Sequence, residues 1–296
     1  MRTAIGIDVG GTQMRAARIS ATGDVLDWTA QPTASEPLLV VVQLREMVRR
    51  LDDASVAAIG IGVPGRVDSR RGRILSGGYV DLAGVSLSDG LNDARRRPVL
   101  VDNDGNMAMA GEYAAGAARG IQSAVMFTIG TGIGGAIISD GAMLRGRMAA
   151  GQMGHIVIDG DGERCICGRR GCVETVSSGT ALGRHIAAAG LAPGIGVETL
   201  LARAAEKDAT ALRVLAAWAA PMRHAIDTAV AVVDPEVVVL GGGLGTAMHR
   251  ALTEFPAEAP WYQCPLVPAV LGDRAGVVGA GLSALAVVKD HAVSAQ

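Results

Sequence analysis

The sequence predicts a duplicated α/β scaffold with two related lobes, because one pattern of elements occurs twice. The apolar stretch at residues 4–9 is a strand that runs into Gly10-Gly11-Thr12, and a second strand pattern follows at 14–20. Residues 124–139 repeat the order of strand, glycine turn and strand, with the turn at Gly130–Gly135. This repeat fits a duplicated fold with one glycine turn in each half better than a single doubly wound sheet.

Local patterns predict the other elements. Apolar residues recur at helical spacing up to Leu51, which indicates a helix from about Glu36. Further strands are expected at 25–30, 56–62, 99–101 and 237–240, and further helices at 108–118, within 195–230 and at 276–290. We expect an N-terminal lobe over residues 1–118, closed by a C-terminal helix over 279–296, and a C-terminal lobe over 119–278.

Composition narrows the functional class. The chain has 296 residues, of which 49 % are hydrophobic, so it can bury a substantial core. Its net charge is −2 and it has no long basic or acidic block, so a nucleic-acid partner is not expected. It shows no secretory signal pattern, and no apolar run is long enough to cross a bilayer. We therefore expect a cytoplasmic protein without a membrane partner.

The two glycine turns are candidate phosphate-binding loops. Glycine lets backbone N–H groups come close to phosphate oxygens, and a threonine hydroxyl adds a donor. Ordinary β-hairpins with glycine at positive φ are the alternative, and they explain either turn alone better. Neither turn has the Gly-Lys-Ser/Thr ending of a Walker loop, and neither precedes a helix as a dinucleotide-binding loop does. Their occurrence in both halves favours phosphate binding by Gly10, Gly11, Thr12, Gly130, Thr131 and Gly132.

Two further features complete a candidate nucleotide site. Asp8 stands at the end of the first strand, where its carboxylate could hold Mg²⁺ through water, since hard cations prefer oxygen ligands. Gly241 follows a buried-type strand, and with it Gly242 and Gly243 form a third place for close backbone approach, suited to adenine and ribose. These features indicate a nucleotide and a catalytic Mg²⁺ as cofactors.

A polar segment follows the strand at 99–101. Residues 102–106 read Asp-Asn-Asp-Gly-Asn, and strand ends in α/β folds face the ligand crevice. A sugar hydroxyl that attacks a γ-phosphate needs a proton acceptor, which a carboxylate here can provide, and Asn103 could fix a neighbouring hydroxyl. An Asx-rich turn that caps the next helix explains the same residues without catalysis. The residues alone leave both explanations open.

Four residues have the spacing of a structural zinc site. His155, Cys165, Cys167 and Cys172 form the pattern H-x9-C-x-C-x4-C. Three thiolates and one imidazole give Zn²⁺ a closed tetrahedral set of ligands, which is typical of a structural site. Three buried free thiols are the alternative, but these cysteines lie in an Arg- and Gly-rich turn and not on an apolar strand. We expect a structural Zn²⁺ on this loop of the C-terminal lobe.

These motifs, in this order, resemble the ROK family of bacterial sugar kinases and sugar-responsive repressors. The likeness runs over nearly the whole chain and is carried by Asp8-Val9-Gly10-Gly11-Thr12, Gly62-Val63-Pro64-Gly65, Asp102-Asn103-Asp104, Gly130–Gly135, Gly154-His155, Cys165–Cys172 with Glu174, and Gly241-Gly242-Gly243. The resemblance implies an actin/hexokinase-like (ribonuclease H-like) fold whose two lobes close on ATP and a hexose. It also implies a homodimer or a tetramer.

The resemblance implies roles for single residues as well. Asp104 would be the general base, and Asn103 would be a sugar ligand. The backbone at Gly65 would approach the sugar ring, and Glu174 would hydrogen-bond the sugar hydroxyls. His155 would bind zinc through one ring nitrogen and lie beside the sugar.

Two substrate-side features depart from the family pattern, and one is that residues 75–79 lack an Asn that often occurs in the family's sugar kinases. The family usually has Glu three residues before the Gly-His histidine, and this chain has Gln152 there. The amide keeps one acceptor, gains a donor and removes a charge, so it should recognise a different pattern of hydroxyls or substituents on the sugar. The identity of the sugar is therefore less determined than the kinase chemistry.

We therefore expect an ATP:hexose phosphotransferase, with phosphorylation of glucose at O6 as the family default. Other hexoses and amino sugars stay open, namely N-acetylglucosamine, N-acetylmannosamine, kanosamine, mannose, fructose and allose. A different class is a sugar-sensing transcriptional regulator of the same family that lacks its DNA-binding domain. A third possibility is a non-catalytic sugar-binding protein, against which the retained Asp104 argues, since a pure receptor has no use for a base.

Overall fold

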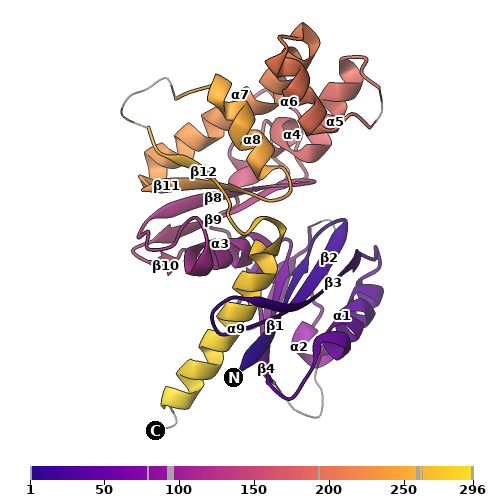
Figure 1. Cartoon of the computed structure of the whole chain (residues 1–296), viewed down its shortest axis with the longest axis vertical. Helices are drawn as coiled ribbons and strands as arrows, with labels where there is room; N and C mark the ends of the chain where they lie inside the picture. Colours follow the sequence, from indigo (N-terminus) through magenta and orange to yellow (C-terminus); the bar gives the residue numbers. More distant parts are fainter. Residues whose placement is uncertain are drawn as a thin grey trace. The chain divides into compact units, whose positions relative to one another are not determined.

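The computed structural model of the chain describes residues 2–78, 80–91, 97–192, 194–257, 261 and 263–294. The chain divides into two compact units. Unit 1 comprises Met1–Gly120, Arg145–Ala150 and Val270–Gln296, and unit 2 comprises Ile121–Leu144 and Gly151–Ala269. The chain thus leaves unit 1 and returns to it twice. The two units are drawn with their elements in Figure 1.

Unit 1 is built on a five-stranded sheet with the strand order β3-β2-β1-β4-β7. Its strands are β1 (Thr3–Val9), β2 (Gln13–Ile19), β3 (Val25–Pro32), β4 (Val56–Val63) and β7 (Val99–Asn103). β1, β2 and β3 form an antiparallel meander, whereas β4 and β7 run parallel to β1. The carboxyl ends of β1, β4 and β7 therefore meet at one edge of the sheet.

The helices of unit 1 begin and end for local reasons. α1 (Pro37–Leu51) has Pro at its start, where the missing N–H costs nothing, and it buries Leu44, Met47 and Leu51. α3 (Asp104–Ala115) begins where the Asn103 side chain accepts a hydrogen bond from the N–H of Asn106. The sequence-based start at residue 108 was too late, because the polar residues before it already form the first helical turn. The unit also contains α2 (Leu87–Gly90) and the hairpin of β5 (Arg66–Asp68) and β6 (Arg73–Ser76).

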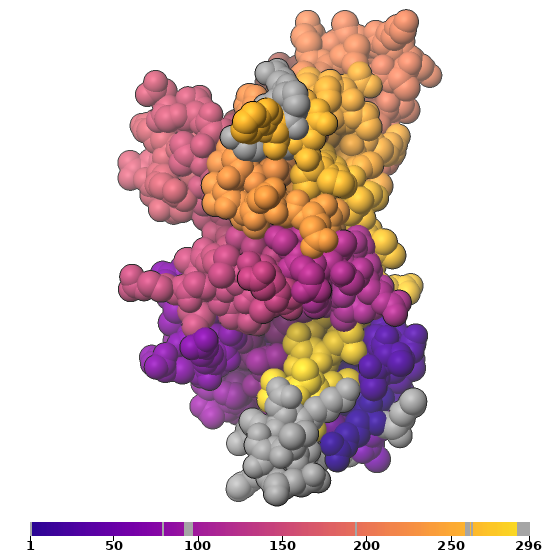
Figure 2. Space-filling model, turned by 90° about the vertical axis from the view of Figure 1, so that its left-hand side faces the viewer, coloured from indigo at the N-terminus to yellow at the C-terminus, as the bar shows by residue number. Residues whose placement is uncertain are grey.

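The last helix, α9 (Ala275–Ser294), packs directly on the sheet of unit 1 through glycines. A Cβ atom at Gly6 of β1 would lie 1.9 Å from the Val277 oxygen, and one at Gly60 of β4 would lie 1.9 Å from the Ala280 oxygen. No side chain fits in these places, so glycine is what permits the contact. Figure 1 shows α9 beside β1 and α3, and in Figure 2 its yellow residues lie next to the indigo residues of the N-terminal strands.

Unit 2 repeats the design around a sheet with the strand order β10-β9-β8-β11-β12. Its strands are β8 (Ala124–Ile129), β9 (Ile133–Ser139), β10 (Ala142–Met143), β11 (Val237–Gly241) and β12 (Leu266–Pro268). β8, β9 and β10 are antiparallel, and β11 and β12 extend the sheet in parallel with β8. β9 begins at Ile133, so Gly134 and Gly135 belong to the strand and not to the turn, which corrects the turn expected over Gly130–Gly135.

Helices carry the core of unit 2. They are α4 (Glu174–Ser177), α5 (Gly179–Ala188), α6 (Val197–Ala205), α7 (Ala209–Val233) and α8 (Gly245–Ala251). Asp208 caps the start of α7, because its carboxylate accepts the N–H groups of Thr210 and Ala211. Asp234 follows the end of the helix in a left-handed conformation. Its Trp218 is fully buried and donates its indole N–H to the Ser178 oxygen at 3.1 Å. Among the described residues, no helix combines the length and apolarity that crossing a membrane requires.

Candidate active site

Unit 1 gathers three acidic residues at the carboxyl ends of its parallel strands. The register pairs Asp8 of β1 with Gly62 of β4, and Gly62 with Asp102 of β7. Asp104 follows two residues later, as the first residue of α3. Gly62 lets the start of α3 pack close to the strand ends, because a Cβ atom there would lie 3.3 Å from the Asp104 Cα and from the Met107 side chain. This edge of the sheet is where open α/β folds bind their ligands.

Asp104 has the properties of a general base that works near neutral pH. Burial, together with the negative charge of Asp8, raises the pKa of Asp104 to about 7. Hydrogen bonds act in the opposite direction, including one of 2.8 Å from the N–H of Gly105 to Asp104 Oδ1. A carboxylate with a pKa near the working pH is both present in its basic form and strong enough to accept a proton.

Asp8 is the second carboxylate with a shifted proton equilibrium. Burial raises its pKa to about 6, the nearby Arg15 opposes this, and Asp273 adds to it. Arg15 Nη1 lies 3.9 Å from Asp8 Oδ2, and the Asp8 side chain keeps 20 % of its surface exposed. A partly exposed carboxylate at a strand end is a suitable oxygen ligand for Mg²⁺ or for its water shell, so the residue fits the metal.

Asn103 and Gly65 are brought together beside the acidic residues. Asn103 Nδ2 donates to the Gly65 oxygen at 2.9 Å, while Asn103 Oδ1 accepts the N–H of Asn106 at 3.2 Å. Gly65 has φ +93°, and a Cβ atom there would lie 2.1 Å from the Ser76 oxygen, so only glycine fits. The capping explanation of this segment therefore holds for Asn103, and Asp104 Oδ1 also accepts a first-turn N–H, that of Gly105.

Asp102 is a buried anchor, a role that no sequence pattern indicated. Its side chain is 3 % exposed, and Oδ2 accepts two hydrogen bonds from Arg145, from Nε at 3.0 Å and Nη2 at 2.8 Å. Oδ1 accepts the N–H of Asn103 at 2.7 Å and Nδ2 of Asn106 at 3.0 Å. The partner lies 43 residues away in the sequence, which is why spacing and periodicity could not reveal it.

The glycine turn of unit 1 is held by a threonine that sequence reasoning also missed. Thr33 donates its hydroxyl to the Gly10 oxygen at 2.7 Å and its N–H to the Thr12 oxygen at 3.0 Å. The N–H of Gly10 donates to the Gln13 oxygen at 3.0 Å, which closes the turn. Gly11 and Thr12 are exposed at its tip, where a phosphate could reach them.

In unit 2 the glycine turn of residues 130–132 meets the third glycine segment. The start of α5 binds the turn, since the Gly179 N–H donates to the Gly130 oxygen at 2.7 Å and the Thr180 hydroxyl to the Thr131 oxygen at 2.8 Å. Gly242 has φ +76°, and a Cβ atom there would lie 2.5 Å from the Ile129 oxygen. The structure thus brings together Gly130, Thr131, Gly132, Gly242 and Gly243, as a nucleotide site requires.

The four predicted zinc ligands form one cluster in unit 2. Their ligand atoms all lie within 4.8 Å of one another. His155 Nδ1 lies 3.6 Å from Cys165 Sγ, and Cys167 Sγ lies 3.5 Å from Cys172 Sγ. In a tetrahedral zinc site, metal–ligand bond lengths place sulfur and nitrogen about 3.6 Å apart and two sulfurs about 3.8 Å apart. The donor set and its spacing therefore fit Zn²⁺.

The backbone of the zinc loop is shaped by glycine. Gly168 has φ +91° and Gly171 has φ +68°. A Cβ atom at Gly171 would lie 1.5 Å from the Asp159 oxygen. Without a metal, burial and the neighbouring thiols raise the pKa of Cys172 to about 12. Such crowded thiols lose their protons together only when a cation compensates their charge.

Gln152 precedes the four candidate zinc ligands in the sequence, and Glu174 follows them. Glu174 Oε2 accepts the N–H of Ile133 at 2.8 Å, so its carboxylate lies against the first residue of β9. Gly154 packs on the same residue, because a Cβ atom there would lie 2.0 Å from the Ile133 oxygen. Gln152 is half-buried and directly precedes the 3-10 turn η1 (Met153–His155). These contacts place His155 and Glu174 beside the strand that leaves the glycine turn.

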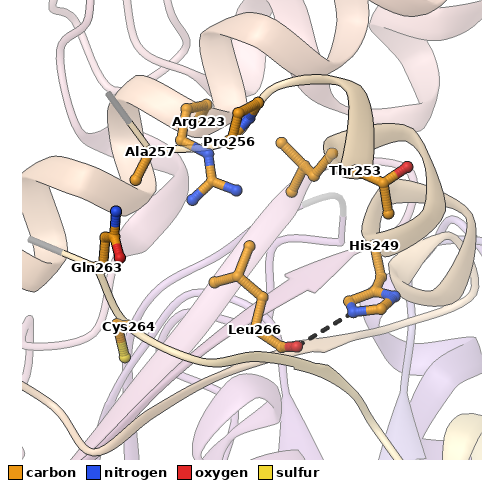
Figure 3. Close-up of a pocket in the computed structure, with 9 residues that line it drawn as sticks. Arg223, His249, Thr253, Pro256, Ala257, Gln263, Cys264 and Leu266 are labelled. Atoms are coloured by element: carbon orange, nitrogen blue, oxygen red, sulfur yellow. Dashed lines mark hydrogen bonds between the residues drawn. The ribbon is translucent and has the colours of Figure 1, made fainter. Parts of the chain in front are cut away.

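A separate pocket of about 400 Å³ lies elsewhere in unit 2 (Figure 3). Its lining comes from α7, α8, the 3-10 turn η2 (Leu252–Glu254), the loop segments 256–257 and 263–264, and the start of β12. It comprises Arg223, His249, Leu252, Thr253, Pro256, Ala257, Gln263, Cys264 and Leu266. None of the predicted site residues lines it. His249 Nε2 is hydrogen-bonded to the Leu266 oxygen at 3.1 Å, so its ring orientation is fixed by the backbone.

The topology of both units and the chemistry of their glycine turns define the actin/hexokinase-like class of phosphotransferase folds. The chain belongs to the ROK family, whose model matches residues 4–287. It is 32 % identical to a glucokinase of Halalkalibacterium halodurans, over 94 % of this chain and 93 % of that protein. It is 33 % identical to an N-acetylmannosamine kinase of Citrobacter koseri, over 95 % of this chain and 98 % of that one.

The fold comparison agrees with the family. The ROK glucokinase of Streptomyces griseus, solved in complex with glucose and AMPPNP, superposes with a TM-score of 0.84 at 29 % identity. The match covers 96 % of this chain and 99 % of that chain. The family and the fold class expected from the sequence are therefore confirmed.

Proposed function

We propose that this chain is an ATP-dependent hexose kinase and that Asp104 is its general base. The observation that carries the proposal is the Asp104 carboxylate, which lies at the ligand-binding edge of the unit 1 sheet with its pKa raised to about 7. A purely sugar-binding protein would have no need for a base poised in this way. The kinases named among the relatives support the same reaction class.

In the proposed reaction a sugar hydroxyl attacks the γ-phosphorus of ATP. Asp104 accepts the hydroxyl proton, the new bond forms between the sugar oxygen and phosphorus, and the bond from phosphorus to the β-phosphate oxygen breaks to release ADP. Asn103 and the Gly65 backbone orient the sugar from unit 1. Gln152, His155 and Glu174 are its proposed ligands from unit 2.

The nucleotide is proposed to bind through backbone groups and one carboxylate. Gly10, Gly11 and Thr12 in unit 1, and Gly130, Thr131 and Gly132 in unit 2, would donate to phosphate oxygens. Gly242 and Gly243 would adjoin the adenosine. Mg²⁺ would be held by Asp8, directly or through water, and when bound it neutralises charge on the transferred phosphoryl group.

A structural Zn²⁺ is proposed on His155, Cys165, Cys167 and Cys172. Support comes from the tetrahedral spacing of the four ligand atoms. The ion would fix the loop that carries His155 and, through Cys172, the start of the segment that carries Glu174. It would order two sugar contacts and take no part in phosphoryl transfer.

Glucose, phosphorylated at O6, is the proposed substrate, and N-acetylmannosamine is the leading alternative because relatives of both kinds match at similar identity. Gln152 bears on this choice, since an amide offers a donor where a carboxylate would offer only acceptors. A homodimer, or a tetramer, is the proposed assembly, and light scattering of the purified protein would measure it.

A coupled assay of ADP release over a panel of hexoses and amino hexoses tests the proposal. We expect one sugar to stimulate turnover with Mg·ATP strongly above the rate with ATP and water alone. Positional analysis of the product by NMR then identifies the phosphorylated hydroxyl. Absence of stimulation by every sugar of the panel would refute the kinase function.

A further inference from the structure

Residues 145–150 belong to unit 1, although the stretches before and after them in the chain belong to unit 2. The segment is a compact loop, since the Arg145 oxygen accepts the N–H of Met148 at 2.8 Å and that of Ala150 at 3.4 Å. Gly146 and Met148 both adopt positive φ, of 52° and 65°. A loop of this kind needs an external anchor to hold its place, because its own bonds fix only its shape.

Arg145 supplies that anchor. Its guanidinium donates two hydrogen bonds to one oxygen of Asp102, at 3.0 Å and 2.8 Å, and the Asp102 side chain is 3 % exposed. A buried carboxylate with a two-fold guanidinium contact is held in one orientation, and the geometry of the planar fork is specific for Arg. The backbone of the loop adds a weaker contact, from Arg66 Nη2 to the Arg147 oxygen at 3.4 Å.

The other oxygen of Asp102, Oδ1, contacts residues on the sugar side of the candidate active site. It accepts the N–H of Asn103 and the amide of Asn106, at 2.7 Å and 3.0 Å. Asn103 Nδ2 in turn donates to the Gly65 oxygen. Asn103 Oδ1 caps α3, whose first residue is Asp104. One network therefore connects Arg145 with every unit 1 residue that is assigned to the sugar or to the proton.

We propose that Arg145 is a positioning residue for the sugar half of the reaction, which acts through Asp102 on Asn103, Gly65 and Asp104. The inference rests on the proposed kinase function and adds a residue to which no contact with the sugar or ATP has been assigned. It assigns the pair of buried Asp102 and half-exposed Arg145 a role in substrate geometry and not merely in stability. Misplacement of a reacting group by about 1 Å is enough to lower a rate by about 100-fold.

The test compares Arg145→Met, Arg145→Lys, Asp102→Asn and the double variant Asp102→Asn/Arg145→Met. Arg147→Met is the matched control, because Arg147 is exposed on the same loop. Sugar KM, ATP KM and kcat are measured for each, together with the melting temperature. The wild-type protein is assayed first, so that a failure of the kinase function is recognised before the variants are interpreted.

We expect Arg145→Met to lower kcat/KM for the sugar by about 10- to 100-fold, and to leave the KM for ATP within about twofold. Arg145→Lys should recover part of the loss, since it restores the charge but not the fork. The double variant removes both charges, so it should melt near the wild type and still show at least a tenfold loss in kcat/KM.

Two results would overturn the inference. One is a double variant that regains both stability and kcat/KM, which would make the pair a packing element only. The other is an Arg145→Met protein whose sugar kinetics equal those of Arg147→Met. If Arg145→Met does not fold, the double variant and Arg145→Lys carry the same test.

Discussion

β1 and β2 of unit 1 and β8 and β9 of unit 2 are antiparallel hairpins with glycine and threonine in their turns. In each hairpin we compare the cross-strand residue pair that is second from the turn. This pair is Asp8 with Arg15 in the first hairpin and Thr128 with Gly134 in the second. The first hairpin thus places two charges beside its turn, where the second places a hydroxyl and a bare backbone. The same hairpin architecture therefore presents different chemical groups in the two units.

The same division extends over the two groups of candidate residues. Unit 1 contributes ionisable side chains, Asp8 and Asp104, whose pKa values are raised to about 6 and about 7. Both units offer a backbone glycine turn, and unit 2 adds the candidate metal-binding cluster and Glu174. We infer that changes in unit 1 act mainly on the chemical step, whereas changes in unit 2 act on binding and on local stability.

The largest effect is expected for Asp104→Asn. The amide cannot accept the hydroxyl proton, so kcat should fall by about 10²- to 10⁴-fold while the melting temperature stays near the wild-type value. Steady-state kinetics and thermal unfolding measure the two quantities. Asp89→Asn, at an exposed residue of α2, is the control. Retention of wild-type kcat in Asp104→Asn would remove it from the role of base.

The contrast between the hairpins is tested by Asp8→Asn against Thr128→Ala. Loss of the Asp8 charge should lower kcat by about 100-fold and raise the Mg²⁺ concentration needed for half-maximal rate. Thr128→Ala should change kcat by less than about threefold, since no charge is lost there. A direct readout is the binding of Mn²⁺, as a substitute for Mg²⁺, followed by electron paramagnetic resonance. Equal losses in both variants would contradict the division of labour.

The pH dependence of kcat/KM for the sugar sharpens the assignment of the base. Asp104 must be deprotonated to accept a proton, and its pKa in the protein is about 7. Activity should therefore fall about tenfold per pH unit as the pH drops below about 7, and level off above it. The raised pKa also affects stability. Between the ordinary Asp pKa and about 7, Asp104 holds a proton in the folded protein but not in the unfolded chain, so the contribution of this group to the free energy of unfolding falls as the pH rises through that range. A flat profile from pH 5 to 8 would count against Asp104.

The zinc site offers the corresponding test in unit 2. Cys172→Ser should remove the metal, lower the melting temperature by several degrees and raise the sugar KM more than the ATP KM. Metal analysis of the wild type should give about one zinc per chain. Cys264→Ser lies outside the cluster and serves as control. A wild-type protein without zinc, as purified and after zinc addition, would eliminate the site.

The smallest effects are expected for Gly10→Ala and Gly130→Ala, which compare the two turns directly. A Cβ atom at Gly10 would lie 2.7 Å from the Gln13 oxygen, so this variant should be destabilised. No described atom lies within 4 Å of a Cβ at Gly130, so that variant should fold normally. It should raise the KM for ATP severalfold, because the methyl group would point into the space proposed for phosphate. Unchanged ATP kinetics would mean that phosphate does not approach Gly130.

Local pattern was sufficient for much of the fold. The strands β1, β4, β8 and β11 were predicted within one or two residues because each is a short continuous apolar run, and α1 was predicted because its apolar residues recur at helical spacing. The spacing of His155, Cys165, Cys167 and Cys172 likewise predicted a cluster, and the structure places the four side chains together, whereas zinc binding itself stays a prediction. Turn boundaries were less accurate. A Cβ atom at Gly135 would lie 2.3 Å from the Met126 oxygen, so this glycine reports close strand packing and not a turn.

Contacts between distant residues could not be predicted. The Asp102–Arg145 pair and the contacts of Thr33 join segments that share no local pattern. Glu112 is a further case, a fully buried carboxylate in α3 that accepts the N–H groups of Ala117, Val270 and Leu271. Its sequence neighbourhood is that of an ordinary helix, and two of its three partners, Val270 and Leu271, lie in the segment with which the chain returns to unit 1.

The return of the chain through α9 has a consequence for biosynthesis. β1 and β4 carry the glycines that receive α9, so their sheet stays uncovered on that side until about residue 285 has left the ribosome. Residues 151–269 of unit 2 are synthesised earlier and need no later segment for their core. The segment that is translated first is thus completed last, and the nascent chain must keep an apolar surface protected for most of its synthesis. We expect chaperone binding to the nascent chain to end only when α9 emerges.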